Sequence, residues 1–254
     1  MAIIAESNEN GVCIIELAHP NKHNPYNEQL ENEIQAALLR ANNDPNVIAI
    51  VVTGGENRSF SVGGDFNEVK NLIGGSDVDR WIDRVTALYA SALNIDKPTI
   101  ASIEGFAIGM GFQFAMMFDW RIMSETAELR MPELKYGIGC SVGCAILHHV
   151  VGYNNMREII YNCENIDPQK ALQYGLINEI FAPDVLLKKS IEIAQKLGNY
   201  PVTSFQNTKK VITKSLLNKL YETAEESKKV HKACFQQKSP QQHFKNILKE
   251  KYNQ

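Results

Sequence analysis

Four short apolar runs, most of them rich in β-branched residues, constrain the fold of this chain more than any other feature. Each has the length of a strand, and each is bounded by polar or helix-forming segments, so we predict buried strands. The runs are VCIIEL (12–17), VIAIVVT (47–53), TIASI (99–103) and WRIMS (120–124).

The segments between these runs have helical periodicity. In residues 27–42, Leu30 and Ile34 fall on one helical face, and Asn27 can cap the first turn. Residues 77–93 carry a second apolar stripe of the same kind. Strand, helix and strand at this spacing predict parallel strands joined by right-handed crossovers. The first two thirds of the chain are therefore predicted to form an α/β structure.

From residue 183 onward the strand signal disappears, and helices with charged outer faces are expected instead. Their predicted ranges are 184–197, 202–215, 218–237 and 241–249. Before them, Asp167 and Pro168 begin a short helix that Gly175 ends. We therefore predict a core over residues 1–182 and a helical C-terminal extension over residues 183–254.

The composition is that of an ordinary globular protein and argues against two classes of partner. Of the 254 residues 44% are hydrophobic and 22% are charged, and the net charge is −3, so no basic field favours nucleic acid. No apolar run is long enough to span a bilayer, and the first residues, MAIIAESNENG, do not resemble a signal peptide. We expect a cytoplasmic protein with no nucleic-acid or membrane partner.

The cysteines and the common cofactor motifs give no sign of a metal or nucleotide site. Five scattered cysteines favour reduced thiols over a disulfide framework. Cys140 and Cys144 have no second ligand pair nearby, so small buried residues are the better interpretation than metal ligands. No GxGxxG motif follows a strand and no P-loop lysine motif occurs. We expect no metal ion.

Two glycine-bearing turns follow predicted strands and are the first candidates for a site. Residues 58–65 (RSFSVGGD) follow the second strand, and residues 105–115 (GFAIGMGFQFA) follow the third and lead into a short helix. Glycine lets the backbone turn sharply and lets a ligand approach closely. The first segment, taken alone, is better explained as a plain turn. If the two turns are adjacent in space, each offers one amide to the same oxygen, an oxyanion hole suited to a thioester that becomes an enolate.

A third segment places a carboxylate near such a turn. Glu133 lies in MPEL (131–134), just before the glycine-rich run GIGCSVG (137–143). A lone glutamate in a loop is usually only solvated. It becomes a candidate catalytic residue if it faces the other two segments.

Together the three segments resemble the crotonase (enoyl-CoA hydratase/isomerase) superfamily, and the resemblance runs over nearly the whole chain. Residues 59–66 match its AFxAGADL pattern, residues 105–114 match GxAxGGGxEL, and residues 132–143 match PEIxLGxxPGxG. The resemblance implies a spiral of ββα units and a trimer or a hexamer in solution. It also implies that the helical C-terminal extension, residues 183–254, serves trimerisation and covers the site. It also implies that the substrate is an acyl-CoA, with coenzyme A carried by the substrate and no further cofactor.

Carried over position by position, the resemblance assigns candidate site residues. The two amides of the oxyanion hole would belong to Gly64 and Met110. The adenine end of CoA would lie near four residues of the N-terminal region. These are Lys22, His23, Asn24 and Val62.

The chain departs from the hydratase pattern at one position. Hydratases use two glutamates to add water to an enoyl double bond, but here Gln113 stands where the first would be, and Glu133 alone remains. Glutamine cannot exchange a proton as a carboxylate can, so ordinary hydration is disfavoured. Longer runs, such as GFAIGMGFQFAMMFD (105–119), are similar to superfamily members that use malonyl-CoA.

The implied reaction begins with loss of CO2 from malonyl-CoA. The resulting enolate adds to the C=N bond of pyrroline-5-carboxylate, the cyclic form of glutamate semialdehyde, and water then cleaves the thioester. In this interpretation Glu133 and Gln113 position and activate the water. The alternatives are another acyl-CoA activity of the superfamily (a malonyl- or methylmalonyl-type decarboxylase, an isomerase or a hydratase) and a non-catalytic acyl-CoA-binding subunit.

Two further residues are candidates for binding the amino-acid substrate. Trp81 lies on an apolar helical stripe, where tryptophan is usually core, and the resemblance favours a pocket wall. His231 lies among lysines, so a solvated basic face competes with a role in holding the substrate carboxylate or ordering the nearby helix. Three lysines near the C-terminus are either surface charge or contacts to CoA phosphates of a neighbouring subunit. They are Lys245, Lys249 and Lys251.

Overall fold

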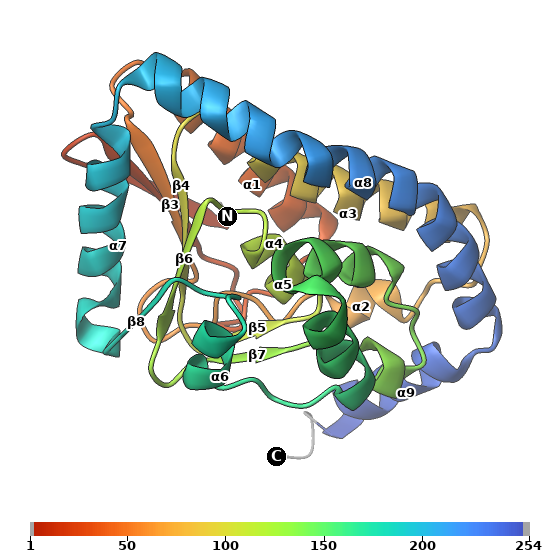
Figure 1. The fold of residues 1–254 in the computed structure, drawn as a ribbon. Coiled ribbons are helices and arrows are strands. Elements are labelled where there is room, and N and C mark those ends of the chain that lie inside the picture. Colours follow the sequence, from red (N-terminus) through yellow and green to blue (C-terminus); the bar gives the residue numbers. More distant parts are fainter. Residues whose placement is uncertain (1–2, 251–254) are drawn as a thin grey trace.

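The computed structural model describes residues 3–250, and a six-stranded sheet lies at its centre (Figure 1). The strand order is β1-β2-β3-β4-β6-β8. Strands β1 and β2 are antiparallel, and the other neighbours are parallel. The strands are β1 (Ile4–Glu9), β2 (Val12–Leu17), β3 (Ala49–Thr53), β4 (Thr99–Ile103), β6 (Trp120–Ser124) and β8 (Glu179–Phe181). The four strands predicted from the apolar runs are confirmed as β2, β3, β4 and β6, and so is their parallel arrangement.

A second, two-stranded sheet lies beside the large one. Strands β5 (Phe106–Ile108) and β7 (Glu128–Arg130) pair in parallel, and Ser61 makes an isolated bridge to Ala107. The chain thus passes repeatedly from the large sheet to the small sheet and then into a helix. This is the ββα spiral that the family resemblance predicts.

Helices cover both faces of the large sheet. Helix α7 (Pro183–Gly198) packs on one face, where Ile14 and Val51 contact its apolar side. The alternate residues, such as Ile15 and Val52, point to the opposite face, as the period of two in a strand requires. That face is covered by α1 (Glu28–Asn43), α3 (Ser76–Leu93), α4 (Met110–Ala115) and α5 (Ser141–Asn162).

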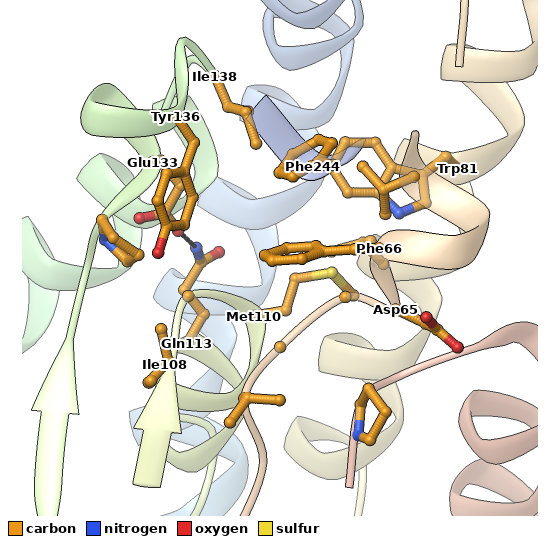
Figure 2. Close-up of a pocket in the computed structure, with 18 of the residues that line it drawn as sticks. Asp65, Phe66, Trp81, Ile108, Met110, Gln113, Glu133, Tyr136, Ile138 and Phe244 are labelled. Carbon is orange, nitrogen blue, oxygen red and sulfur yellow. Dashed lines mark hydrogen bonds between the residues drawn. The ribbon is translucent and has the colours of Figure 1, made fainter. Parts of the chain in front are cut away.

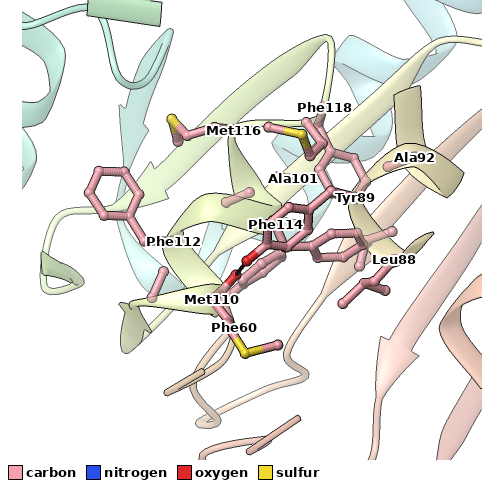
Figure 3. Close-up of a cluster of buried hydrophobic side chains, with 14 of the residues drawn as sticks. Phe60, Leu88, Tyr89, Ala92, Ala101, Met110, Phe112, Phe114, Met116 and Phe118 are labelled. Atoms are coloured by element: carbon pink, nitrogen blue, oxygen red, sulfur yellow. Dashed lines mark hydrogen bonds between the residues drawn. The ribbon is translucent and has the colours of Figure 1, made fainter. Parts of the chain in front are cut away.

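Aromatic side chains fill the main core between α3 and α4. Phe114 stacks on Phe60 and Tyr89 with ring centroids 6.5 and 6.4 Å apart, and it meets Phe118 edge-on at 5.1 Å (Figure 3). All four rings are almost completely buried. The short helix α4, which follows the second glycine turn, is therefore held rigidly by its own apolar residues.

The C-terminal region is helical in the described residues, as predicted, but with one difference. Helix α8 runs unbroken from Val202 to Gln236, so the prediction of two helices, 202–215 and 218–237, is wrong. Leu216 and Leu220 lie on the buried side of α8 in the main core, and no glycine or proline interrupts the segment. Packing therefore continues through the expected break, and α8 lies across α3 and α5 (Figure 1).

Three shorter helices and a 3-10 turn complete the fold. Asp167 caps α6 by accepting a hydrogen bond from the Lys170 amide, as the Asp-Pro pattern predicts. No helix in residues 3–250 is both long and apolar enough to cross a membrane. The elements are α2 (Phe66–Val69), η1 (Glu133–Tyr136), α6 (Pro168–Gln173) and α9 (Ser239–Glu250).

Candidate active site

A cavity of about 440 Å³ lies where the glycine turns meet α3, η1 and the C-terminal helices. Figure 2 shows Glu133, Gln113 and Tyr136 on one side of it and Trp81 and Phe244 on the other. The spiral delivers both glycine turns and the start of α5 to this place. Segments from His19 to Leu248 thereby form one site.

The two glycine turns lie against each other. A Cβ atom built on Gly63 would come within 2.7 Å of the Ile108 carbonyl oxygen and 3.2 Å of the Met110 nitrogen. Gly63 also has a φ of +85°, a backbone conformation that residues other than glycine rarely adopt. Only glycine at this position lets the backbone of the first turn approach the second so closely.

Two backbone amides are left over where the turns meet. The neighbouring backbone amides make hydrogen bonds: the Asp65 amide donates to the carbonyl oxygen of Tyr26, and the Gly109 amide donates to that of Arg130. Within residues 3–250, the amides of Gly64 and Met110 have no acceptor. Both belong to residues that line the cavity. Free, preorganised donors of this kind suit an oxygen that gains negative charge during a reaction.

Glu133 is the carboxylic acid next to these amides. Its Oε1 would lie 3.3 Å from a Cβ atom on Gly109, the residue before Met110. Oε1 accepts a hydrogen bond of 2.9 Å from Nε2 of Gln113, whereas the buried Oε2 has no hydrogen-bond partner in the described residues. Burial raises the pKa of Glu133 from 4.5 to about 7, against the opposing effect of its hydrogen bonds. The group can therefore hold or release a proton near neutral pH.

Trp81 and His231 meet on the opposite wall. Their rings are 5.5 Å apart, edge to face, and both residues line the cavity. His231 is 6% exposed, and its Nδ1 lies 2.8 Å from the Ser227 carbonyl oxygen, so its side chain does not belong to a solvated basic face. Burial lowers the pKa of His231 despite hydrogen bonds to the backbone of Ser227 and Gly139. Trp81 is both core and pocket wall, because it also packs on two apolar clusters.

The residues expected near the adenine of CoA divide into two groups. Val62 and His23 line the cavity, and His23 Nδ1 lies 2.8 Å from the Ser59 hydroxyl. Lys22 is exposed and does not line it. The Asn24 side chain is fully buried and donates to the carbonyl oxygens of Gly54 and Ser59, so it holds the first glycine turn in place.

The C-terminal lysines are only partly described. Lys245 is exposed on α9. Lys251 and the side chain of Lys249 lie outside the described residues.

Several wall residues escaped sequence analysis. Phe66, Tyr136 and Phe244 line the cavity, and Phe244 stacks on Phe66 with centroids 4.5 Å apart. Phe66 could have been found from its place directly after the GGD of the first turn. Phe244 carries no signal beyond the amphipathic pattern of its helix, because its contacts are set by how α9 folds back.

Known proteins with a similar sequence define the class to which this site belongs. The enoyl-CoA hydratase/isomerase family model matches residues 7–254. The chain therefore belongs to the enoyl-CoA hydratase/isomerase family. Carboxymethylproline synthase of Pectobacterium carotovorum subsp. carotovorum is 50% identical over 250 residues, which are 98% of this chain and 100% of that protein. The short-chain-enoyl-CoA hydratase of Clostridium acetobutylicum is 32% identical over 76% of this chain and 75% of its own length.

Solved structures agree with this assignment. ThnE from S. clavuligerus superposes with a TM-score of 0.77 at 30% identity and covers 90% of this chain and 100% of its own. An enoyl-CoA hydratase from Bacillus halodurans superposes with a TM-score of 0.87, covering 96% of this chain and 100% of its own. Its identity of 22% makes it a likeness of fold alone.

Proposed function

We propose that this chain is a carboxymethylproline synthase. It decarboxylates malonyl-CoA, adds the enolate to pyrroline-5-carboxylate and hydrolyses the thioester, giving carboxymethylproline, CoA and CO2. The observation that carries the proposal is the 50% identity to such a synthase over essentially both full lengths. The site supports it, because the buried carboxylic acid of Glu133 is paired with the neutral amide of Gln113. In the hydratase pattern a second glutamate stands at the position of Gln113.

Decarboxylation needs a place for negative charge. When the carbon–carbon bond to the malonyl carboxylate breaks, its electron pair moves into the thioester and makes an enolate oxygen. The amides of Gly64 and Met110 are the donors that stabilise this oxygen. The thioester is the electron sink, so the step requires no change in oxidation state of any group outside the substrate.

The new carbon–carbon bond forms when the enolate carbon attacks the carbon of the C=N bond. The electron pair of that double bond moves to nitrogen, which takes up a proton. Trp81 and His231 form the wall opposite Glu133, and we assign them to the pyrroline ring and its carboxylate. An aromatic wall also keeps water from protonating the enolate before the bond forms.

Thioester cleavage uses Glu133. Its carboxylate takes a proton from water, the hydroxide adds to the thioester carbon, and the oxygen of the tetrahedral intermediate returns to the same two amides. The C–S bond then breaks, and the CoA thiolate takes up a proton. A pKa of about 7 leaves a substantial fraction of Glu133 ionised at neutral pH, which suits a general base.

Gln113 explains why the site does not favour hydration. The enzyme must accommodate a malonyl carboxylate and then an enolate, and a second carboxylate in a buried pocket would repel both. The amide instead donates a hydrogen bond to Glu133 without adding charge.

Product analysis tests the proposal. Malonyl-CoA is supplied with and without pyrroline-5-carboxylate, and CO2, acetyl-CoA and carboxymethylproline are measured by mass spectrometry. Carboxymethylproline formed with both substrates supports a synthase. Acetyl-CoA alone under both conditions would identify a simple decarboxylase, and binding without any product would identify a non-catalytic subunit. Rapid hydration of crotonyl-CoA would return the hydratase interpretation. We further propose that the product enters carbapenem antibiotic biosynthesis.

A further inference from the structure

A tyrosine hydroxyl lies next to the pair formed by Glu133 and Gln113, inside an otherwise apolar core. Tyr89 is completely buried on α3, and its ring stacks on Phe114 (Figure 3). Its hydroxyl lies 3.2 Å from Oε1 of Gln113 and 3.3 Å from the carbonyl oxygen of Met110. Tyr89 does not line the cavity, so it touches neither substrate, yet it contacts two residues that do.

We propose that Tyr89 is a positioning residue that fixes the orientation of the Gln113 amide, so that Gln113 donates to Oε1 of Glu133 and leaves Oε2 for the water. The proposal rests on the function proposed above for Glu133. It adds a residue to the site that the glycine motifs and the family pattern do not contain.

The side-chain amide of Gln113 has two different faces. Gln113 can present either its NH2 group or its oxygen to Glu133, and the two orientations have nearly the same shape. The single proton of the Tyr89 hydroxyl has two acceptors within reach, Oε1 of Gln113 at 3.2 Å and the Met110 carbonyl oxygen at 3.3 Å. Donation to Oε1 favours the orientation in which that oxygen faces α3. Burial raises the pKa of Tyr89 well above its usual value, so the hydroxyl keeps that proton as a donor.

The orientation of Gln113 determines which form of Glu133 is favoured. An NH2 group donating to Oε1 stabilises the ionised acid, and this hydrogen bond lowers the pKa that burial raises. The flipped amide would face the carboxylate with its own oxygen and would favour the protonated acid. Without Tyr89 the amide can flip, so the ionised base should become rarer at neutral pH.

The other titratable groups around Glu133 leave the direction of this effect unchanged. Cys140 and Cys144, at the start of α5, interact with Glu133, and burial raises the pKa of both thiols, so they stay neutral. His231 on α8 and Asp65 before α2 line the same cavity from the other walls. Tyr136 on η1 lines it beside Glu133. None of these side chains is altered by a substitution at Tyr89.

The test compares Tyr89→Phe with a matched control. Tyr26→Phe also deletes the hydroxyl of a fully buried tyrosine whose ring packs on Phe114, at 5.9 Å, but Tyr26 makes no hydrogen bond to Gln113. The first readout is the titration of Glu133 by isotope-edited infrared spectroscopy, with Glu133→Gln identifying its band. We expect the midpoint to rise by about 0.7 pH unit in Tyr89→Phe, equivalent to about 1 kcal/mol, and to stay unchanged in Tyr26→Phe.

Kinetics and a double variant supply the second readout. The acid limb of the pH profile for carboxymethylproline release should move up by the same amount in Tyr89→Phe, roughly a fivefold loss well below the midpoint. In a Gln113→Leu background, Tyr89→Phe should cause no further shift. An unchanged Glu133 midpoint in Tyr89→Phe, or a shift that persists in Gln113→Leu, overturns the proposal. Because the infrared titration needs no substrate, this failure is distinct from a failure of the synthase assignment, which would appear in the wild-type product assay.

Discussion

Glu133 shows how one residue combines a cost to the fold with a use in chemistry. An ionised carboxylate without water or a cation is unfavourable in an apolar site, and the protein reduces that cost by raising its pKa and by one hydrogen bond from Gln113. The same environment holds the acid near the pKa at which a general base works best at neutral pH. Two predictions at this residue separate the two effects.

Removing the carboxylate should stop thioester hydrolysis more than decarboxylation. We expect Glu133→Ala to lower the release of free carboxymethylproline by about 10²- to 10⁴-fold, the usual loss for a general base. Decarboxylation should fall less, because it depends on the amides of Gly64 and Met110. Single-turnover assays that follow CO2 and carboxymethylproline separately check this. Unchanged release of the free acid would remove Glu133 from the mechanism.

The stability of the fold should respond to pH at the same residue. The pKa of Glu133 is about 7 in the folded chain against 4.5 for an ordinary glutamate. Its protonation therefore adds to the free energy of unfolding fully below pH 4.5, and this contribution is lost as the pH rises through 7. At 1.4 kcal/mol per pH unit, the loss is about 3 kcal/mol. Relative to Glu133→Gln, the wild type should therefore lose unfolding free energy between pH 5 and pH 8. Unfolding free energies are measured by urea denaturation at each pH. If they changed with pH in the same way in both proteins, the raised pKa of Glu133 would be contradicted.

At Gln113 we expect charge to determine specificity. Gln113→Glu places a second carboxylate beside Glu133, and repulsion should weaken the use of malonyl-CoA. A slight gain in crotonyl-CoA hydration is expected, since two carboxyl groups can share the proton transfers. The gain should be small, because the walls around Met110 and Trp81 are unchanged. Both rates are measured side by side in wild type and variant. A variant that uses malonyl-CoA as well as the wild type does would refute the charge argument.

At the scale of elements, α9 joins two segments that carry site residues. Phe244 is fully buried, stacks on Phe66 directly after the first glycine turn, and meets Tyr136 of η1 with centroids 6.3 Å apart. Gln241 adds hydrogen bonds to the carbonyl oxygens of Leu72 and Phe235. Helix α9 therefore closes one wall of the cavity and links the first glycine turn to the segment that carries Glu133.

Loosening that wall should change the product ratio. In Phe244→Ala we expect water to reach the enolate, so that acetyl-CoA increases at the expense of carboxymethylproline. The ratio should rise severalfold, and the measurement is chromatography of both products from the same reaction. Phe205→Ala, on the part of α8 that does not line the cavity, is the control and should leave the ratio unchanged. An unchanged ratio in Phe244→Ala would show that α9 does not exclude water.

The elements also show what sequence patterns can and cannot predict. The strands β2, β3, β4 and β6 were predictable because parallel strands buried on both faces are continuous apolar runs. Strand β1 (IAESNE) was not, since it is an exposed edge strand whose pairing depends on backbone hydrogen bonds rather than on apolar side chains. Strands β5 and β7 have three residues each, too few for any periodicity.

The site was predictable to the extent that its chemistry lies in local motifs. Glu133 and Gln113 were found from glycine-bearing segments, and the structure brings them within hydrogen-bond distance. Tyr89 was visible only as one member of an apolar stripe. Its hydroxyl meets an amide 24 residues further along the chain, and no pattern within α3 records that contact. The same holds for Phe244, whose partner Phe66 lies in the first third of the chain.

At the scale of the whole molecule, two packed helices carry exposed apolar side chains. Helices α5 and α8 contact each other, and Tyr161 and Val211 on their outer sides are 67% and 76% exposed. Val211 and its neighbour Ile212 on α8 are both exposed, and adjacent large apolar side chains at a surface favour contact with another protein. The family resemblance predicts that this surface belongs to a second and third copy of the chain.

We therefore expect a trimer, or a hexamer of two trimers, in light scattering at micromolar concentration. Val211→Asp combined with Ile212→Asp, both exposed on α8, should shift the mass toward the monomer, because burying two charges without partners is strongly unfavourable. Leu39→Asp, at an exposed position on α1, is the control and should keep the assembly of the wild type. A wild-type monomer would contradict the prediction. It would also remove any contribution of Lys245 to a neighbouring subunit's CoA, so the CoA phosphates would then have to be held by residues of the same chain.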